Sequence, residues 1–491
     1  MKYLSAVDAA FLRMESKRTP MHVGGLLTFK LPKGAPRAFL RDLLDHLRSQ
    51  PFMPPPFEWR LARKGLHRFA PAWQKADVDL DYHIRHSALP YPGGERELGV
   101  LVARLHSHPM DLRRPLWEVH IIEGLENNRF ALYFKAHHCA VDGMAGMRMV
   151  RSWLSENPGD LSGPPPFVAP AERPAVKLPL RSRLSRPVKV AGEQVRSLGE
   201  LIRVLRKMSM PGQAGGVRAA LTTPRSMFNV AIGQQRRLGT QILDLNRVKG
   251  IAQATGASVN DVCLAICGGA VRRYLKERGA LPKKSLLASV PVGLPRPDGK
   301  GGNAVAGFVC PMGTDISDPL KRVQQINAVT SLAKEQLREM SPTALEQFTM
   351  LGLSPLILGQ MAGILPKLPP LFNVVVSNVV ASKVPLYLRG AQLEAMYPMS
   401  VLFDGYGLNI TLVGYMDRIA VGFTGCRETI PSLQKLAVYS SQALGDLERA
   451  VAKVAGVNQK DRKSPALAPG AAAGVPAPAK KAVRKRAGKR G

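Results

Sequence analysis

The sequence predicts an α/β protein built from two α/β sandwich units, each with a sheet covered by helices. Segments with the two-residue period of strands alternate with segments that have the 3.6-residue period of helices along most of the chain. A basic stretch dense in proline separates these segments into two sets of similar size. The chain has 491 residues, of which 45% are hydrophobic, so it is long enough for two domains with a sizeable core.

The first unit is expected over residues 1–157. A short helix, a strand and an amphipathic helix open it, and a further helix and strand follow. These predicted elements cover residues 5–14, 21–31, 36–48, 97–108 and 119–123. Trp117, in the segment PLWE before the last of these strands, is expected to anchor the core between strands.

The segment RFALYFKAHHCAVDG, residues 129–143, closes this unit and carries the most specific chemical signal. The alternation of its apolar residues predicts a half-buried strand. Extending that alternation places His138 on the apolar face and His137 on the other face. Asp142 is the expected N-cap of a helix that starts at Gly143.

These residue types indicate proton transfer. A neutral imidazole at the end of a buried strand can accept a proton near neutral pH, which makes His138 the candidate general base. The alternative is that His138 is a core histidine and that Asp142 is only a helix cap. Cys139 is disfavoured as a nucleophile, because its place next to a histidine points it to the opposite strand face.

Residues 158–235 are predicted to be a basic linker. Its opening part, 158–187, is dense in proline and is a poor helix former. Residues 194–208 have the pattern of an amphipathic helix, which either packs along the body of the protein or attaches to a membrane surface.

The second unit is expected over residues 236–455. Strands are predicted over residues 238–245, 286–292 and 372–380, with a hairpin formed by residues 408–415 and 419–423. Helices are predicted over residues 245–255, 258–274, 319–340 and 432–454. Ser258 is the expected N-cap of the second of these helices, and Asp404 with Gly405 is expected to form a turn that orients the hairpin.

The segment 347–366 is uncharged over 20 residues. Pro355 and several glycines interrupt it, so a spanning helix is not expected. A buried helix or a membrane-facing apolar surface fits this pattern better.

The net charge of +33 is concentrated in two segments. Residues 160–237 hold 14 Lys and Arg against four Asp and Glu, and residues 456–491 hold ten against one. The tail, 456–491, is dominated by Ala, Pro, Lys and Arg and is predicted to be disordered. Basic segments of this kind attract polyanions such as an anionic membrane surface, nucleic acid or phosphate-bearing substrates.

The remaining composition limits the choice of site and compartment. The five cysteines form no Cys-x-x-Cys pair, and the first 20 residues lack the apolar core of a signal peptide, which together suit a cytoplasmic protein. Catalysis is expected to need no metal, because no cluster shows ligand spacing and His83 and His86 are expected at the surface. A content of 6% aromatic residues and the lack of a recognition module argue against a specific nucleic-acid partner, and a non-enzymatic polyanion-binding protein is the remote alternative.

Six segments in order resemble the bacterial wax ester synthase/acyl-CoA:diacylglycerol acyltransferases over about residues 3–455. They are LSAVDAAFLRMES at 4–16, PLWE at 115–118, HHCAVDG at 137–143, ASVNDVCLA at 257–265, NVVVSNV at 373–379 and YPMSVLFDGYGLNIT at 397–411. The resemblance implies two chloramphenicol-acetyltransferase-like domains with a solvent channel between them and His138 as the base at its middle.

The resemblance also implies a reaction and its partners. A fatty acyl group would pass from acyl-CoA, with no other cofactor, to a long-chain alcohol or to diacylglycerol, without an acyl-enzyme intermediate. The protein would be cytoplasmic and peripherally attached to the inner membrane face or to lipid inclusions. An enzyme of the peptide-synthetase condensation type, with an amine acceptor or a carrier-bound substrate, is the nearest alternative.

The supporting residues are assigned less directly. Asn378 and Ser377 are candidates for the oxyanion site, or else belong to a turn at the end of a strand. Asn260 either lines the channel or is only a polar residue in the first turn of a helix. Asp142 is expected to order the loop of the base. Where the family usually has Pro-Val-Ser-x-Arg, this chain has PVGLPR at 291–296, with one extra residue and no serine. Despite this departure, Arg296 is expected to face Asp142 in a salt bridge.

Overall fold

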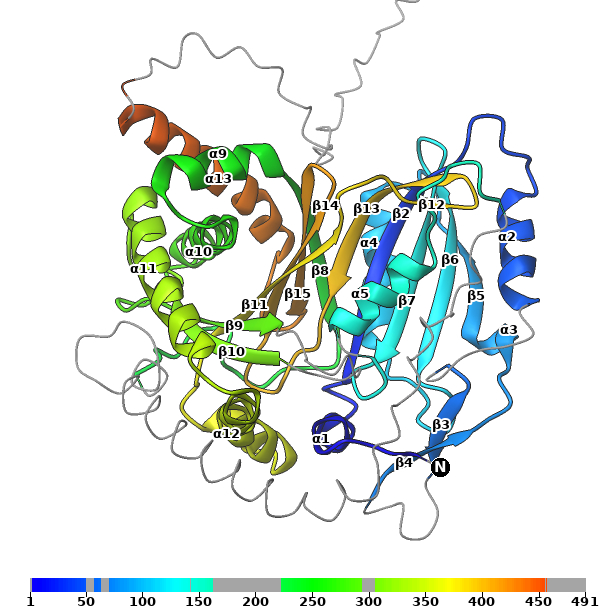
Figure 1. Ribbon diagram of the computed structural model, residues 1–491, viewed down its shortest axis with the longest axis horizontal. Coiled ribbons are helices and arrows are strands. Elements are labelled where there is room, and N and C mark those ends of the chain that lie inside the picture. The colour runs from blue at the N-terminus through cyan, green and yellow to red at the C-terminus, as the bar shows by residue number, and fades with distance from the viewer. Residues whose placement is uncertain are drawn as a thin grey trace, which may run out of the picture. The chain divides into compact units, whose positions relative to one another are not determined.

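The computed structural model describes residues 2–49, 57–62, 70–141, 143–161, 222–293, 305–454 and 456 (Figure 1). The described residues up to Val451 form one compact unit. The expected amphipathic helix at 194–208 and the expected disordered tail lie outside the described residues.

Two six-stranded sheets organise this unit, as the α/β class predicted from the sequence requires. The first has the order β12-β13-β2-β7-β6-β5 and the second the order β10-β9-β11-β14-β15-β8. The strands of the first sheet are, in chain order, β2 (His22–Lys30), β5 (Ile84–Ala88), β6 (Trp117–Leu125), β7 (Arg129–His137), β12 (Tyr387–Leu388) and β13 (Ala391–Met399). Those of the second are β8 (Arg236–Asp244), β9 (Leu287–Gly293), β10 (Val305–Pro311), β11 (Val374–Ser382), β14 (Leu408–Tyr415) and β15 (Arg418–Cys426). A small sheet joins β1 (Lys2–Tyr3), β4 (Ala72–Lys75) and β3 (Trp59–Ala62).

The helices begin where the local sequence favours it. The first half carries α1 (Ala6–Met14), α2 (Phe39–Arg48), α3 (Leu80–His83), α4 (Glu95–Ser107) and α5 (Gly143–Ser152). The second half carries α9 (Leu245–Thr255), α10 (Val259–Glu277), α11 (Pro319–Arg338), α12 (Pro342–Met361), the 3₁₀ turn η2 (Leu365–Lys367) and α13 (Gln434–Val454). Side chains of Ser5, Asp244, Ser258, Asp318 and Ser341 cap helix N-termini. Ser258 forms the predicted cap, and its own amide N–H donates in return to the Asp261 carboxylate.

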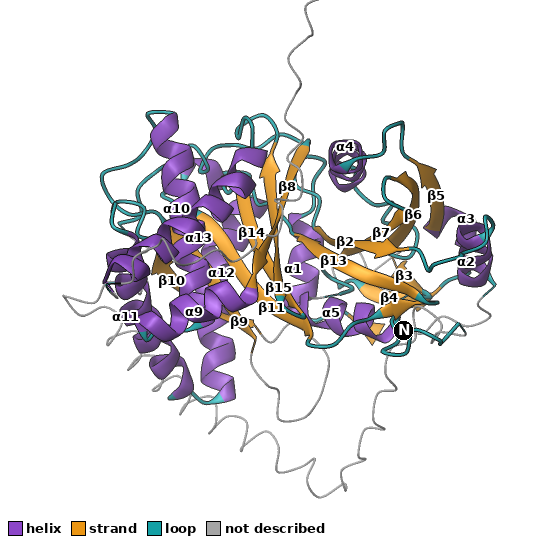
Figure 2. Ribbon diagram, turned by 90° about the horizontal axis from the view of Figure 1, so that it is seen from above, coloured by secondary structure: helices purple, strands orange, loops and turns teal. Residues whose placement is uncertain are grey.

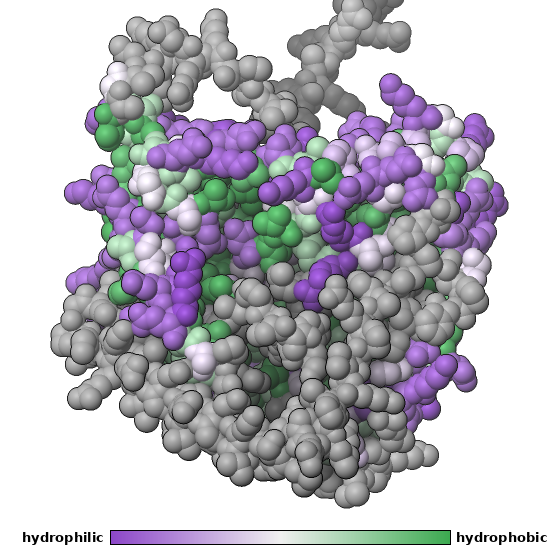
Figure 3. Space-filling model, viewed as in Figure 1, coloured by the Kyte–Doolittle hydropathy of each residue, from purple (hydrophilic) through white to green (hydrophobic). Residues whose placement is uncertain are grey.

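The helices α9, α10, α11 and α13 cover one face of the second sheet (Figure 2). Cys263 and Cys267 of α10 are fully buried in this core, so they behave as small apolar groups. Among the described helices, none alone is long and apolar enough to cross a membrane, and the pair α9 and α10 meets that requirement only jointly, across a bend of 104°. On the face of the molecule shown in Figure 3, hydrophilic residues are interspersed with hydrophobic ones over the described surface.

One strand passes from the second half of the chain into the first sheet. β13 pairs antiparallel with β2, so that Met396 lies opposite Leu27 and Met399 opposite Gly24. A division of the chain at residue 236 therefore does not describe the sheets, because Tyr387–Met399 extends a sheet whose other strands precede residue 138. Gly422 of β15 permits this crossover, because a Cβ there would lie 2.0 Å from the Pro398 carbonyl oxygen.

The prediction that residues 129–137 form a half-buried strand was wrong about its burial. β7 is central in the first sheet, and both of its faces are covered. Phe130, Leu132 and Phe134 pack on the side of α2 and α5. Ala131 and Tyr133 pack with residues of α4, β8 and β15, so the second face forms the contact between the two halves.

Candidate active site

The loop after β7 is a tight turn that presents His138. β7 ends at His137, and the His138 amide N–H donates to the Met21 carbonyl oxygen at 2.8 Å, which holds the loop against the beginning of β2. The Ala140 and Val141 amides both donate to the His137 carbonyl oxygen, at 2.9 and 3.2 Å. Gly143 then begins α5, where the sequence predicted a helix to start.

The imidazole of His138 is half-buried and lies flat against a ring from another element. Its centroid is 3.9 Å from that of Phe11 in α1, with an interplanar angle of 11°. The ring nitrogens of a histidine form hydrogen bonds in the plane of the ring. Stacking on Phe11 therefore fixes that plane.

His137 is fully buried, and both of its ring nitrogens are engaged within the protein. Its Nδ1 accepts a hydrogen bond from the Cys139 amide at 3.1 Å, so the ring proton lies on Nε2. That Nε2–H donates to Glu15 Oε2 at 2.9 Å. His137 therefore has no ring nitrogen left to accept a proton from a substrate.

Glu15 is a part of this arrangement that the sequence reasoning missed. Its Oε2 accepts the His137 ring proton and also the Met21 amide N–H at 2.7 Å, so one buried carboxylate ties α1, β2 and the loop of the base together. Glu15 is the C-cap of α1, where a negative charge opposes the helix dipole. That unfavourable position was the available sequence signal that this carboxylate has a partner elsewhere.

Cys139 is packed among apolar side chains, including Trp73 and Leu116, and is 4% exposed. Burial, together with the charges of Asp8 and Glu15, raises the pKa of its thiol well above the ordinary value. The thiolate that nucleophilic attack requires is thus disfavoured at neutral pH. The geometry is consistent with the expectation that Cys139 does not attack substrate.

Ser377 and Asn378 lie inside β11 and not at its end, because the strand continues to Ser382. The alternative of a turn at the strand end is therefore wrong. Successive side chains of a strand point to opposite faces, so the two cannot serve one oxyanion together. Asn378 shares a face with Val374 and Val376, which pack in the core of the second half.

The amide of Asn378 donates to Asn260 Oδ1 at 3.4 Å, so Asn260 in the first turn of α10 contacts the sheet instead of pointing to solvent. Ser377 lies on the other face of β11. Val379 and Ala381 share that face and pack against the cluster that contains Val141 and the α5 residues. Since α5 lies beside β11, the Ser377 hydroxyl is the candidate that faces the side of the base.

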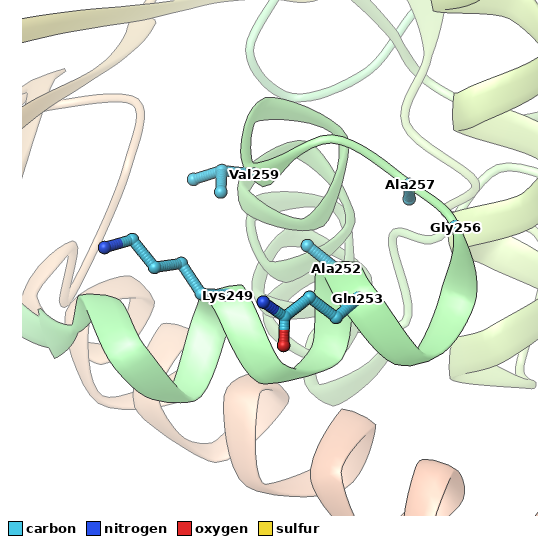
Figure 4. A pocket seen from close by; sticks show the side chains of 6 residues that line it. All are labelled: Lys249, Ala252, Gln253, Gly256, Ala257 and Val259. Atoms are coloured by element: carbon cyan, nitrogen blue, oxygen red, sulfur yellow. The ribbon is translucent and has the colours of Figure 1, made fainter.

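Two predicted site residues lie outside the described residues. They are Asp142 and Arg296, and with them the expected salt bridge between them. The solvent channel also stays a prediction. A surface depression of about 410 Å³ lies elsewhere, between α9 and the start of α10, where Lys249, Gln253 and Val259 are among its lining residues (Figure 4).

Other polar residues singled out in the sequence have structural roles. Asp404 lies in the expected turn with Gly405 at φ +81°, and its carboxylate accepts from the Ile232 amide and from Arg18, both at 3.0 Å. Trp117 is buried as the expected core anchor, and its indole donates to the Phe57 carbonyl at 2.9 Å.

The prediction that His83 lies at the surface was wrong. Its ring is fully buried and stacks on Trp117, whose carbonyl oxygen lies 2.7 Å from its Nδ1. His86 is exposed, as expected, and pairs with Glu123. Within the part of the chain that the structure describes, no three His, Cys, Asp or Glu side chains are grouped so as to hold a metal ion.

A buried ionic cluster lies on the second face of β7, facing the other half. Lys135 Nζ is 3.2 Å from Glu118 Oε2, and His120 Nε2 is 3.3 Å from the same oxygen. Burial alone would raise the pKa of Glu118, but the hydrogen bond from His120 and the charges of Lys135 and Arg85 lower it to about 2. The same burial lowers the pKa of Lys135, against the attraction of Glu118.

Comparisons with known proteins agree with this arrangement of the chain. The family model of the wax ester synthase/diacylglycerol acyltransferase catalytic domain matches residues 4–263, and the model of the C-terminal domain of the same family matches residues 301–448. The chain is 49% identical over 453 residues to a putative diacylglycerol O-acyltransferase of Mycobacterium tuberculosis, covering 92% of this chain and 99% of that protein. It is 35% identical over 458 residues to the O-acyltransferase WSD of Acinetobacter baylyi, covering 92% and 98% of the two chains.

Solved structures show the same similarity. The wax ester synthase/diacylglycerol acyltransferase from Marinobacter aquaeolei superimposes with a TM-score of 0.74 at 38% identity, covering 92% of this chain and all of that one. The first condensation domain of the CDA synthetase matches with a TM-score of 0.59 at 18% identity over 91% of this chain and 95% of its own, which shows a shared fold alone.

Proposed function

The chain belongs to the wax ester synthase/diacylglycerol acyltransferase family, and we propose that it transfers a fatty acyl group from acyl-CoA to the hydroxyl of a long-chain alcohol or diacylglycerol. One observation carries the assignment of its base. In His137 both ring nitrogens form hydrogen bonds within the protein, one with Glu15 and one with the Cys139 amide. His138, by contrast, is half-buried, and stacking on Phe11 sets the plane of its ring.

In this mechanism His138 accepts the proton of the acceptor hydroxyl while the oxygen attacks the thioester carbon. The resulting tetrahedral intermediate collapses when its C–S bond breaks, and the coenzyme A thiolate takes the proton back from His138. A positioned base contributes about 100- to 10,000-fold to such a step. The products are the ester and free coenzyme A, and no covalent enzyme intermediate is formed.

The intermediate carries a negative oxygen that needs a fixed donor. We assign this role to the Ser377 hydroxyl, because it lies on the face of β11 that packs toward α5, while the Asn378 amide points to Asn260. Cys139 stays protonated in its apolar site and takes no part.

A lipid surface is the proposed partner of this reaction. Both acceptors are insoluble in water, and the net charge of +33 favours anionic membranes or lipid inclusions at the cytoplasmic side.

Truncation after residue 455 removes a segment with ten Lys and Arg against one Asp. We expect this truncation to weaken liposome binding at low salt and to leave turnover of soluble substrates unchanged; equal binding of the two proteins would contradict a role of the tail.

The test is release of free thiol from palmitoyl-CoA with hexadecanol, dioleoylglycerol or hexadecylamine as acceptor. The parent protein should turn over the alcohol or the glyceride, and His138→Ala should lose at least 100-fold in kcat while remaining folded. His86→Ala, at an exposed histidine, is the matched control and should retain full activity.

Three results would contradict the proposal. Equal rates of His138→Ala and the parent would show that His138 is not the general base. A preference for the amine would indicate a condensation-type reaction, and salt-dependent DNA binding without any turnover would indicate a polyanion-binding protein.

A further inference from the structure

The helix α12 and the turn after it expose a set of large aliphatic side chains, which we call the α12 apolar face. Its members are between 37% and 65% exposed: Leu351, Leu358, Met361, Ile364 and Leu368. Leu351, Leu358 and Met361 are spaced by seven and three residues, so they lie on one side of the helix. Between residues 347 and 369 the sequence has one charged residue, Lys367.

Single exposed apolar residues are common in proteins, but several on one side of a helix mark a surface that meets a partner. The opposite side of α12 holds it to the core. Leu356 is 2% exposed and packs with Leu365, Phe372 and Tyr406. The helix is therefore apolar on both sides, and the protein covers only one of them.

The turn that extends the α12 apolar face is held in place by hydrogen bonds from Arg225. The guanidinium of Arg225 donates to the carbonyl oxygens of Pro366, Lys367 and Leu368 at 3.0, 2.8 and 2.8 Å. The face is thus held in place by contacts that do not use its apolar side chains.

The α12 apolar face borders the element that carries the partners of the base. α12 lies beside α1, which supplies Phe11 and ends at Glu15 (Figure 1). Gln360 of α12 bonds to the loop after α1 and to the Asp404 turn, because its amide donates to Thr19 Oγ1 at 3.0 Å and accepts from the Asp404 amide at 2.9 Å.

We propose that the α12 apolar face docks on a phospholipid surface and that the acceptor leaves the lipid next to α1, close to His138. The composition favours this occupant. This face is made of Leu, Ile and Met without a carboxylate, which suits contact with acyl chains, and it lacks the Tyr, Trp and Arg in which protein interfaces are enriched. The positive charges of Lys367 and Arg225 at its edge complement anionic headgroups. The choice of a lipid-borne acceptor rests on the proposed function.

The test uses the full chain with Leu351→Gln, Leu358→Gln and Met361→Gln combined. Binding is measured by flotation with vesicles of phosphatidylcholine and phosphatidylglycerol that contain dioleoylglycerol, at 50 mM and 500 mM salt. We expect the variant to lose at least tenfold in vesicle binding at 500 mM salt, where electrostatic attachment is screened and apolar insertion remains. Val100→Gln with Val438→Gln, at apolar residues exposed elsewhere, is the matched control and should bind like the parent.

Activity separates docking from chemistry. Transfer to the embedded dioleoylglycerol should fall at least tenfold, while transfer to water-soluble hexanol should stay within twofold of the parent. If the triple variant does not fold, Leu358→Gln alone, at the most exposed position of the face, should still weaken flotation severalfold.

Unchanged flotation of the variants would overturn the proposal. So would a change from dimer to monomer in sedimentation with flotation unchanged, because the face would then join two copies of the chain. If neither protein transfers acyl groups to any acceptor, the proposed reaction fails, and the flotation result still decides whether the face docks on lipid.

Discussion

Two substitutions of Glu15 can test whether its hydrogen bonds position the loop that carries His138, because they separate the effect of its charge from that of its geometry. Glu15→Gln keeps the length of the side chain and removes its charge, whereas Glu15→Asp keeps the charge and shortens the reach by one methylene. Oε2 accepts two hydrogen bonds, from His137 and from the Met21 amide, in a side chain that is 9% exposed. Neither donor contacts the reacting atoms, so Glu15 is expected to act as a positioning residue.

The magnitudes follow from these two bonds. A hydrogen bond to a charged group contributes about 1.5–3 kcal/mol and a neutral one about 0.5–1.5 kcal/mol, so Glu15→Gln should lose about 2 kcal/mol of unfolding free energy. The amide oxygen can still hold His137 in place, and kcat should fall about tenfold. In Glu15→Asp the carboxylate cannot reach both donors. A displacement of the loop by about 1 Å costs about 100-fold, so this variant should have the lower kcat.

The assay is steady-state thiol release from palmitoyl-CoA with hexadecanol, together with urea denaturation of each variant. KM for palmitoyl-CoA should stay within twofold, because Glu15 positions the base and does not bind the donor. Glu97→Gln is the control, since this carboxylate accepts the Gly94 amide at 3.0 Å in the cap of α4, outside the loop of the base. A greater loss of kcat in Glu15→Gln than in Glu15→Asp would refute positioning and indicate that the charge itself matters.

Three further predictions follow from the same geometry. Ser377→Ala should lower kcat about 100-fold or more, as expected for an oxyanion donor, and Asn378→Ala should lower it less; the reverse order in thiol-release assays would exchange their roles. Cys139→Ala should retain kcat within twofold and lose about 1 kcal/mol of unfolding free energy, and an inactive but folded variant would contradict direct transfer. Glu118 has a folded pKa of about 2 against an ordinary 4.5, so its contribution to stability is present above pH 4.5 and is lost as the pH falls toward 2. This contribution is at most about 3 kcal/mol, and Glu118→Gln combined with Lys135→Met should show a smaller fall in unfolding free energy between pH 5 and pH 3 than the parent, by urea denaturation at each pH. An equal fall in both proteins would show that other carboxylates cause the acid lability.

The sequence predicted the helices well because their signals are local. Ser5 and Ser258 cap α1 and α10, and a capping bond joins residues only two or three positions apart. The hairpin of β14 and β15 is local in the same sense, since its strands pair across Asp417. Such features need no knowledge of what the rest of the chain does.

The features that the sequence did not predict depend on distant partners. β13 pairs with β2 across more than 360 residues, and nothing in its own two-residue period selects that partner. The burial of Lys135 and His83 depends on elements that cover them, and a polar side chain next to a strand gives no sign of such a cover. Glu15 lies within the first segment that resembles the family, but its partner His137 is 122 residues away.

The crossover of β13 has a consequence for how substrates reach His138. β2 is hydrogen-bonded to β7 on one side and to β13 on the other, and Met21, just before it, accepts the His138 amide and donates to Glu15. The loop of the base is thus fixed by a strand that both halves of the chain pair with. A hinge opening between the halves would have to break the ladder between β13 and β2 and would displace the base at the same time. Movement that leaves this ladder intact is therefore the physically cheaper route for admitting long-chain substrates.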